Sequence, residues 1–369
     1  MSSTNGVHVN GTTTSRPSVR DLKPGIYAPI PTFFLKDSED LDLPTFKSHV
    51  IRVAKAGVGP LLSGSMGEAH HISHEERTSL IRAARSALDS VGLEHVPIVA
   101  GVGAGSTREV VQLGEEAAAA GADASIAIIS GYYAGALASD RKALQAFWTE
   151  VSEKSPIPVI IYNYPGAAGG IDLDSELITT LARTCPNIAG VKLTCGNVGK
   201  LQRICAVVSH PPFTTNHPKS SKVAEGKEGS ESTANYPFLV LGGFVDFLLT
   251  SAFAPAHGAI TGLGNVAPYT LAKLFDLSSR AASTGSGAGE LLLEAQRIQG
   301  IVARADATIA KTGIAGTKYI LEKLYGYGGA PRRPLQPIEA EAGERLWAHE
   351  DTQELVKLER ELSGKFSLD

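Results

Sequence analysis

The feature that most constrains this chain is a repeated alternation of short apolar runs with helical patterns. From Gly25 onward, each run is rich in β-branched residues, reaches a small or glycine-rich turn, and precedes a stretch with apolar residues at helical spacing. The eight runs are 25–34, 59–64, 96–102, 124–130, 157–163, 188–194, 238–243 and 258–263. Because most are continuous and not alternating, they indicate parallel strands buried on both faces. The pattern predicts an α/β fold, a closed (β/α)8 TIM barrel, with an open doubly wound sheet as the alternative.

Composition shifts along the chain predict its domain organisation. We expect a disordered N-terminal tail over 1–24, the barrel over 25–282, and a C-terminal helical extension over 283–369. The stretch 210–237 is rich in Pro, Ser, Lys and Glu and nearly free of large aliphatic residues, which predicts a mobile insertion within the barrel.

Bulk composition excludes several classes of function. The net charge of −4 and the lack of a basic run argue against nucleic acid or an anionic membrane as a partner. No apolar stretch reaches the roughly 18 residues that a transmembrane helix needs. The three cysteines form no CxxC pair, so neither a disulfide framework nor a thiolate zinc site is indicated. The N-terminal stretch lacks the apolar core of a secretory signal, which favours a cytoplasmic protein. Its Ser/Thr-rich, Arg-containing composition keeps mitochondrial import as the alternative.

Reactive side chains follow several of the predicted strands. In a barrel of this type the functional residues lie at the carboxyl ends of the strands. The strand ends here are "GSMGE" (64–68), "GYY" (131–133), "YNYPG" (162–166), Lys192, "GGF" (242–244) and "GLGN" (262–265). A lysine taken alone is more often a solvated strand end or an ion-pair partner than a catalyst. The convergence of one lysine, several tyrosines and glycine-rich turns on one mouth favours the catalytic interpretation of Lys192.

This set of groups suits Schiff-base chemistry. A dry barrel interior lowers the pKa of a lysine, and the neutral amine can attack a ketone. The resulting iminium withdraws electrons, so that a C–C bond can break, while a nearby tyrosine moves the proton. Backbone amides of a Gly-Ser turn can hold a carboxylate. The predicted substrate is therefore a small keto acid.

The ordered motifs "GSMGE", "GYY", "YNYPG" and "GVK" resemble those of the dihydrodipicolinate synthase/N-acetylneuraminate lyase family. The resemblance implies a pyruvate-dependent class I aldolase that forms a homo-oligomer, a tetramer or a dimer, and needs no cofactor. It places Lys192 on the Schiff-base lysine and Tyr162 on the general acid/base. Ser65 and Met66, which follow Gly64, fall on the carboxylate-binding pair.

The same resemblance assigns the remaining site residues. Tyr133 falls on a tyrosine that many tetrameric members insert into a neighbouring subunit's site, and with Ser65 it would extend the proton relay. Ile260 matches a position whose backbone carbonyl faces the lysine pocket, and Gly243 is expected to line the substrate site. No residue is expected to bind a metal.

Departures from the family pattern bear on the substrate. Dihydrodipicolinate synthases carry an arginine where this chain has Ala167, so the ring-forming reaction is not expected. Met66 lacks the hydroxyl usual at its position, so only its backbone amide can serve there. The turns after strands seven and eight contain no Lys or Arg, which disfavours a phosphorylated acceptor.

The stretch "KLTCGN" and the 210–237 insertion resemble the fungal branch of the family. We therefore expect cleavage of a 2-keto-3-deoxy sugar acid, such as L-threo-3-deoxyhexulosonate, or of 4-hydroxy-2-oxoglutarate, to pyruvate plus an aldehyde.

Three alternatives stay open. A hydratase or dehydratase would use the same iminium to break a C–O bond, and a non-catalytic barrel would keep the fold alone. A class II aldolase would need a metal, for which His70 and His74 have helical spacing. However, Ser73 and Glu76 form a capping-box pattern that would start the helix after Ser73 and leave His70 outside it.

A few residues receive structural interpretations. "GVGAGS" (101–106) lacks the third glycine of a dinucleotide loop and is expected to lead into a helix capped by Ser106 or Thr107. Glu68 is expected to accept backbone amides, and Tyr132 to be buried. Gly190 and Gly196 are expected to leave room for the substrate.

Overall fold

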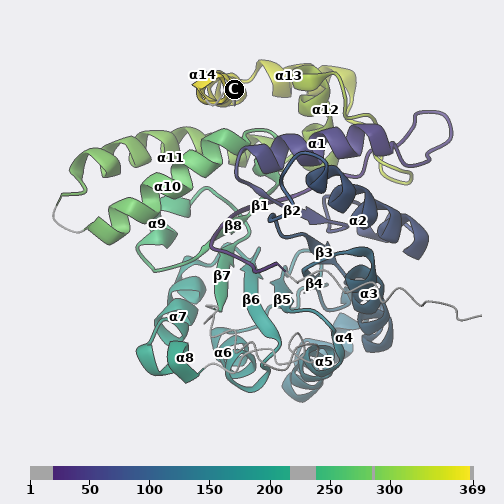
Figure 1. Ribbon diagram of the computed structural model, residues 1–369, viewed down its shortest axis with the longest axis vertical. Coiled ribbons are helices and arrows are strands. Elements are labelled where there is room, and N and C mark those ends of the chain that lie inside the picture. Colours follow the sequence, from purple (N-terminus) through teal and green to yellow (C-terminus); the bar gives the residue numbers. More distant parts are fainter. Residues whose placement is uncertain (1–19, 217–237, 285–286, 366–369) are drawn as a thin grey trace, which may run out of the picture.

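Eight parallel strands close into a barrel in sequential order, as predicted (Figure 1). The computed structural model describes residues 20–216, 238–284 and 287–365. The strands are β1 Gly25–Pro29, β2 Gly59–Leu62, β3 Val99–Gly101, β4 Ala124–Ala127, β5 Val159–Asn163, β6 Ile188–Leu193, β7 Leu239–Gly242 and β8 Gly258–Ile260. They are shorter than the predicted apolar runs, because the runs extend beyond one or both ends of each strand.

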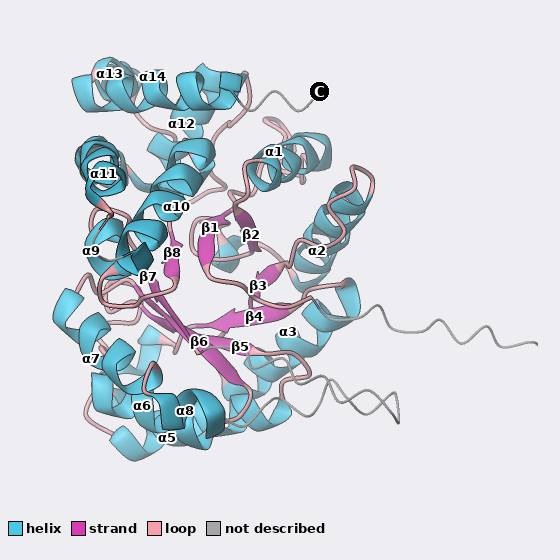
Figure 2. Ribbon diagram, turned by 60° about the vertical axis from the view of Figure 1, so that its left-hand side comes forward, coloured by secondary structure: helices cyan, strands magenta, loops and turns pink. Residues whose placement is uncertain are grey.

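Helices surround the barrel and continue beyond it (Figures 1 and 2). The first ten are α1 Leu43–Lys55, α2 His74–Asp89, α3 Thr107–Ala120, α4 Ala134–Leu137, α5 Arg141–Lys154, α6 Ser175–Thr184, α7 Val198–Val208, α8 Pro211–Asn216, α9 Leu248–Ala252 and α10 Pro268–Thr284. The C-terminal helices are α11 Gly289–Ala310, α12 Gly313–Tyr325, α13 Ala340–Ala348 and α14 Glu350–Lys365.

Short polar side chains start most of the long barrel helices. In each case the N-cap oxygen accepts a hydrogen bond from the backbone amide three residues on, a contact that stabilises a helix by about 1 kcal/mol. The N-cap residues are Asp42, Ser73, Ser106, Asp140, Asp174 and Asn197. At α2 the full capping box forms between Ser73 and Glu76, which confirms the predicted start of that helix and leaves His70 outside it.

The apolar core has two parts. A small cluster fills the barrel interior and comprises Tyr27, Leu61, Val99, Ala124, Ile126, Ile160, Tyr162, Leu239, Leu241 and Ile260. A much larger cluster lies between the outer faces of the strands and the surrounding helices. Because successive strand residues alternate between the two clusters, both faces of the sheet are buried, which explains the continuous apolar runs.

The C-terminal helices form an extension that packs on one side of the barrel (Figure 2). Helix α11 lies along α10, and α14 contacts both. The segment after α12 also reaches α1, where the Tyr327 hydroxyl lies 2.8 Å from His49 Nδ1 and accepts from Arg52 Nε at 3.1 Å.

The predicted tail and the predicted insertion both contain residues that are structured. Arg20, assigned to the tail, forms an ion pair with Asp123 at 3.2 Å. Pro211–Asn216, assigned to the insertion, forms helix α8. The rest of the insertion, 217–237, and residues 1–19 lie outside the described residues. In the described ranges, no helix has the length and apolar character needed to cross a bilayer.

Candidate functional site

Lys192 and Tyr162 lie side by side at the carboxyl ends of neighbouring strands. They face each other in the register of β5 and β6, and Lys192 Nζ is 4.1 Å from the centre of the Tyr162 ring. Their exposed fractions are only 5% and 8%. Within the described part of the chain, the buried lysines that pair with carboxylates are Lys200 and Lys318, and Lys192 is not among them. An amine not committed to an ion pair is available as a nucleophile.

The phenol of Tyr162 has a pKa below its ordinary value. Burial opposes ionisation, but the nearby charge of Lys192 and the polar groups of Ser65, Lys192 and Thr194 outweigh it. By contrast, burial and the neighbouring Tyr162 raise the pKa of Tyr164. The rings of Tyr162 and Tyr164 are stacked, with their centres 5.6 Å apart. Tyr162 is therefore the better proton carrier of the two.

The chain between β2 and the 3-10 turn Ala69–His71 forms a tight loop, which we call the β2 turn (residues 63–68). Three of its carbonyl oxygens accept hydrogen bonds: Gly64 O from Ala69 N at 3.2 Å, Ser65 O from Glu68 N at 3.1 Å, and Gly67 O from Thr32 Oγ1 at 2.7 Å. Among the described residues, no acceptor is hydrogen-bonded to the backbone amides of Ser65 and Met66. A turn with two successive free amides is suited to hold an anion.

The other residues predicted to line the site close the barrel mouth. Ile260 ends β8 and belongs to the inner cluster together with Tyr162. Gly243 follows β7, where an added Cβ would lie 2.2 Å from Thr194 Oγ1, so only glycine fits against β6. The Met66 side chain reaches the 3-10 turn Gly262–Asn265 that follows β8, where a Cβ at Gly262 would lie 3.2 Å from Met66 Cε.

Tyr133 is not brought to Lys192 within one chain. It lies in the 3-10 turn Gly131–Tyr133, is 59% exposed, and contacts Tyr132 edge to face with ring centres 5.0 Å apart. The expectation that Tyr132 is buried is wrong, since it is 88% exposed.

Comparison with known proteins identifies the relationship. Residues 25–213 match the model of the Dihydrodipicolinate synthetase family. The chain belongs to this family. It is 40% identical over 327 residues to "L-threo-3-deoxy-hexylosonate aldolase" of Aspergillus niger, a match that covers 88% of this chain and 93% of the relative. It is 39% identical over 347 residues to "Probable 4-hydroxy-2-oxoglutarate aldolase, mitochondrial" of Emericella nidulans, covering 94% of this chain and 99% of the relative.

Solved structures agree with this assignment. A dihydrodipicolinate synthase family protein from Coccidioides immitis is 32% identical, has a TM-score of 0.72, and is covered over its full length by 94% of this chain. The predicted family and the TIM barrel fold are thus confirmed.

Sequence reasoning missed two features of this family member's site. Thr194 lies two residues beyond Lys192, and its hydroxyl is near enough to Tyr162 to lower the pKa of the phenol. The Thr194 hydroxyl is buried, and among the described residues it makes no hydrogen bond. Its position on the same strand face as Lys192, two residues on, was a signal in the sequence.

The second missed feature is a polar network behind Tyr162. Asn163 donates to Asp172 Oδ1 at 2.7 Å and accepts from the backbone amide of Leu173 at 2.9 Å, while Lys200 forms an ion pair with Asp172. This network ties the loop after β5 to α7. The sequence gives no hint of it, because the three polar residues come from separate elements.

One predicted role is corrected by the packing. Gly190 was expected to leave room for the substrate, but an added Cβ there would lie 2.5 Å from Leu239 O. Gly190 therefore allows β6 and β7 to approach each other. Gly196 has a positive φ of 66°, which is a backbone reason for glycine at that position.

Proposed function

We propose that this protein is a class I aldolase that cleaves a 2-keto-3-deoxy sugar acid, such as L-threo-3-deoxyhexulosonate, or 4-hydroxy-2-oxoglutarate, to pyruvate and an aldehyde. The observation that carries the proposal is the buried pair of Lys192 and Tyr162, with the amine 4.1 Å from the phenol ring and uncommitted to a carboxylate. Family membership and the names of the relatives support the same reaction class.

The reaction follows from the placement of these groups. Lys192 Nζ adds to the C2 ketone, and loss of water forms an iminium. Tyr162 removes the proton of the C4 hydroxyl, the C3–C4 bond breaks, and its electron pair flows to the iminium to form an enamine as the aldehyde leaves. Protonation of the enamine at C3 and hydrolysis of the new iminium release pyruvate and the free amine. The lowered pKa of Tyr162 increases the fraction of phenolate, which is the form that can accept this proton.

The substrate carboxylate would be held by the β2 turn. The free backbone amides of Ser65 and Met66 support this role, and the Ser65 side chain is close enough to Tyr162 to lower the pKa of its phenol. Gly64, Gly243 and Ile260 would line the space around the keto acid. Ala167, in the turn after β5, offers no charge to a second carboxylate in the manner of an arginine.

Assembly and location are also part of the proposal. The exposed Tyr132 and Tyr133 pair is suited to contact with another copy of the chain, which supports a homo-oligomer in which Tyr133 extends the relay of a neighbouring site. We propose a cytoplasmic protein, because free cysteines without a CxxC pair are typical of a reducing compartment. The word "mitochondrial" in the name of the Emericella nidulans relative supports the alternative location.

Pyruvate release from a panel of keto acids tests this function. The panel should contain 3-deoxy-hexulosonates of both C4 and C5 configurations and 4-hydroxy-2-oxoglutarate, with pyruvate measured by a coupled dehydrogenase. We expect at least one substrate to yield pyruvate and aldehyde in equal amounts, and the Lys192→Met variant to yield neither. Consumption of a keto acid without pyruvate would refute the aldolase and identify a dehydratase. No consumption of any member by folded wild-type protein would contradict the function as stated.

A further inference from the structure

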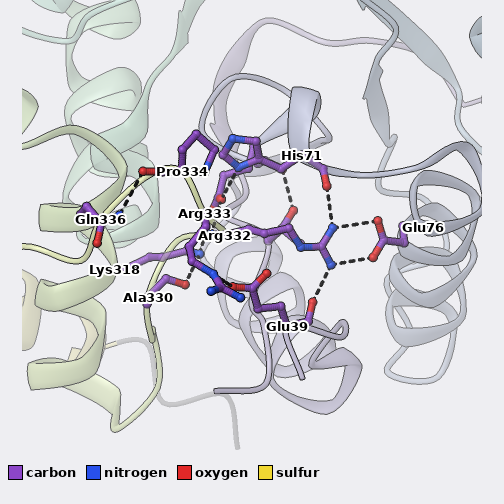
Figure 3. Close-up of polar contacts among 12 residues, drawn as sticks. Glu39, His71, Glu76, Lys318, Ala330, Arg332, Arg333, Pro334 and Gln336 are labelled. Carbon is purple, nitrogen blue, oxygen red and sulfur yellow. Dashed lines mark hydrogen bonds and ion pairs between the residues drawn. The ribbon is translucent and has the colours of Figure 1, made fainter. Parts of the chain in front are cut away.

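Glu68, at the end of the β2 turn, is held by the C-terminal extension. Its carboxylate accepts from Lys318 Nζ of α12 at 2.6 Å, and neither side chain is exposed to solvent. The other carboxylate oxygen accepts from the backbone amide of Arg332 at 2.8 Å and lies 3.0 Å from His71 Nδ1. Lys318 also donates to the carbonyl of Ala330 at 3.1 Å (Figure 3). Three polar groups therefore contact one buried carboxylate.

A second contact ties the same two parts together. The Arg332 guanidinium donates to both oxygens of Glu76 at 2.9 and 2.7 Å, and to the carbonyls of His71 and Glu39 at 2.5 Å each (Figure 3). Glu76 is the capping-box residue of α2, and His71 ends the 3-10 turn that follows Glu68. A paired guanidinium and carboxylate of this geometry is directional, so Arg332 fixes the position of the segment after the β2 turn.

The β2 turn needs such support because its backbone is strained at both ends. Ser63 and Glu68 have φ values of 53° and 55°, in the left-handed region that costs a non-glycine residue about 1 kcal/mol or more. Ser63 is held by Arg77, whose guanidinium donates to Gly101 O at 3.0 Å and to Ser63 O at 3.5 Å. Glu68 is held by the extension. The free amides of Ser65 and Met66 lie between these two anchors.

We propose that Lys318 and Arg332 are positioning residues for keto-acid binding: through Glu68 and Glu76 they hold the β2 turn in the shape that presents its two free amides to the substrate carboxylate. The proposal rests on the proposed function of that turn. It gives the C-terminal extension a role in the affinity of a site that it does not touch. Loss of either contact would let the turn relax, and small displacements of this kind lower affinity or rate strongly.

Borohydride trapping with two carbonyl ligands tests the proposal. Pyruvate carries the carboxylate and acetone lacks it, so the concentration that gives half-maximal labelling of Lys192 reports carboxylate binding only for pyruvate. In Lys318→Met we expect this concentration to rise about tenfold for pyruvate, with the maximal labelling rate and the acetone labelling unchanged. The matched control is Lys323→Met, which removes an exposed lysine of the same helix that pairs with Glu344, and which should leave both ligands unaffected.

Because Lys318→Met leaves the Glu68 carboxylate unpaired in the core, two further variants complete the test. Glu68→Gln combined with Lys318→Met removes both charges, and Arg332→Gln keeps the backbone amide that contacts Glu68. We expect a rise of about tenfold in the double variant and about threefold in Arg332→Gln, again for pyruvate alone.

If Lys318→Met does not fold, Arg332→Gln decides the test. A half-saturating pyruvate concentration in Arg332→Gln equal to that of wild type would then overturn the proposal. In a folded Lys318→Met protein, an unchanged pyruvate concentration, or parallel losses for pyruvate and acetone, would do the same. The proposed function fails differently, since wild-type protein would then not be labelled by pyruvate at all.

Discussion

Lys192 and Lys318 are both buried, and their surroundings differ in one decisive respect. Lys318 is fully buried, and its ammonium lies 2.6 Å from the carboxylate of Glu68. Lys192 is 5% exposed, and its amine faces the Tyr162 ring with no carboxylate among its described ion-pair partners. At Lys318 burial lowers the pKa of the ammonium group, and the nearby Glu68 carboxylate opposes that shift. The partner, and not the burial, separates a structural lysine from a nucleophilic one.

The two sites also differ in what surrounds them. Lys192 belongs to the barrel mouth, beside a phenol with a lowered pKa. Lys318, on α12, faces the chain that follows β1, with its Nζ 4.8 Å from the centre of the Phe34 ring. The first site is built from strand ends, where side chains converge. The second is built from a helix and two loops, where a charge pair locks elements together.

The largest expected effect comes from the phenol beside Lys192. Tyr162→Phe keeps the ring but removes the hydroxyl, so the rate of C–C cleavage should fall by about 10²-fold or more, because general acid/base catalysis contributes that much. Steady-state kcat on the best substrate of the panel measures the effect. Tyr164→Phe is the matched control, since Tyr164 stacks on Tyr162 but has a raised pKa.

For Tyr164→Phe we expect less than about a threefold change, because a phenol that holds its proton firmly is a poor base. Equal kcat losses in the two variants would show that the site needs the stacked pair as a whole, and the assignment of Tyr162 would be lost.

A smaller effect, on stability, is expected from His49 of α1, which contacts Tyr327 of the C-terminal extension. Burial, aided by the charge of Arg52, lowers the pKa of His49 to about 3. In the folded protein the His49 ring stays neutral, and its Nε2 lies 3.0 Å from Asn265 Oδ1. In the unfolded chain the same ring takes up a proton below about pH 6.5. This contribution to stability is therefore complete above about pH 6.5 and is lost as the pH falls toward 3.

At about pH 5 the loss from His49 amounts to about 2 kcal/mol of the free energy of unfolding. Urea unfolding of His49→Gln at about pH 8 and pH 5 should show a smaller acid-induced loss than wild type by this amount. If His49→Gln lost as much stability in acid as wild type, the buried neutral ring would not be a determinant of acid stability.

Much of the fold and the centre of the site could be predicted from the sequence. The eight apolar runs predicted the strands because parallel strands buried on both faces leave a continuous pattern. Lys192 and Tyr162 were predicted to lie close together because a barrel gathers its strand ends at one mouth, and they do lie side by side. The capping box of Ser73 and Glu76 is a local pattern, and it too was readable.

The features that were missed depend on long-range packing. Glu68 was expected to accept backbone amides, and it does accept one from Arg332, but its ion pair with Lys318 spans 250 positions and leaves no local signal. The exposure of Tyr132 was mispredicted because two adjacent aromatic residues are typical of the apolar core, and the sequence does not show the direction of the turn that carries them. Gly190 was explained by room for a ligand, while the close approach of β7 is the physical reason.

The central claim is that Lys192 forms the covalent bond with the keto acid and that Lys318 does not. Reduction with borohydride in the presence of pyruvate, followed by peptide mass spectrometry, tests it directly. The account predicts a single stable adduct on Lys192, absent in Lys192→Met and present in Lys323→Met. A folded wild-type protein with no adduct, or with its adduct on another lysine, would contradict the account.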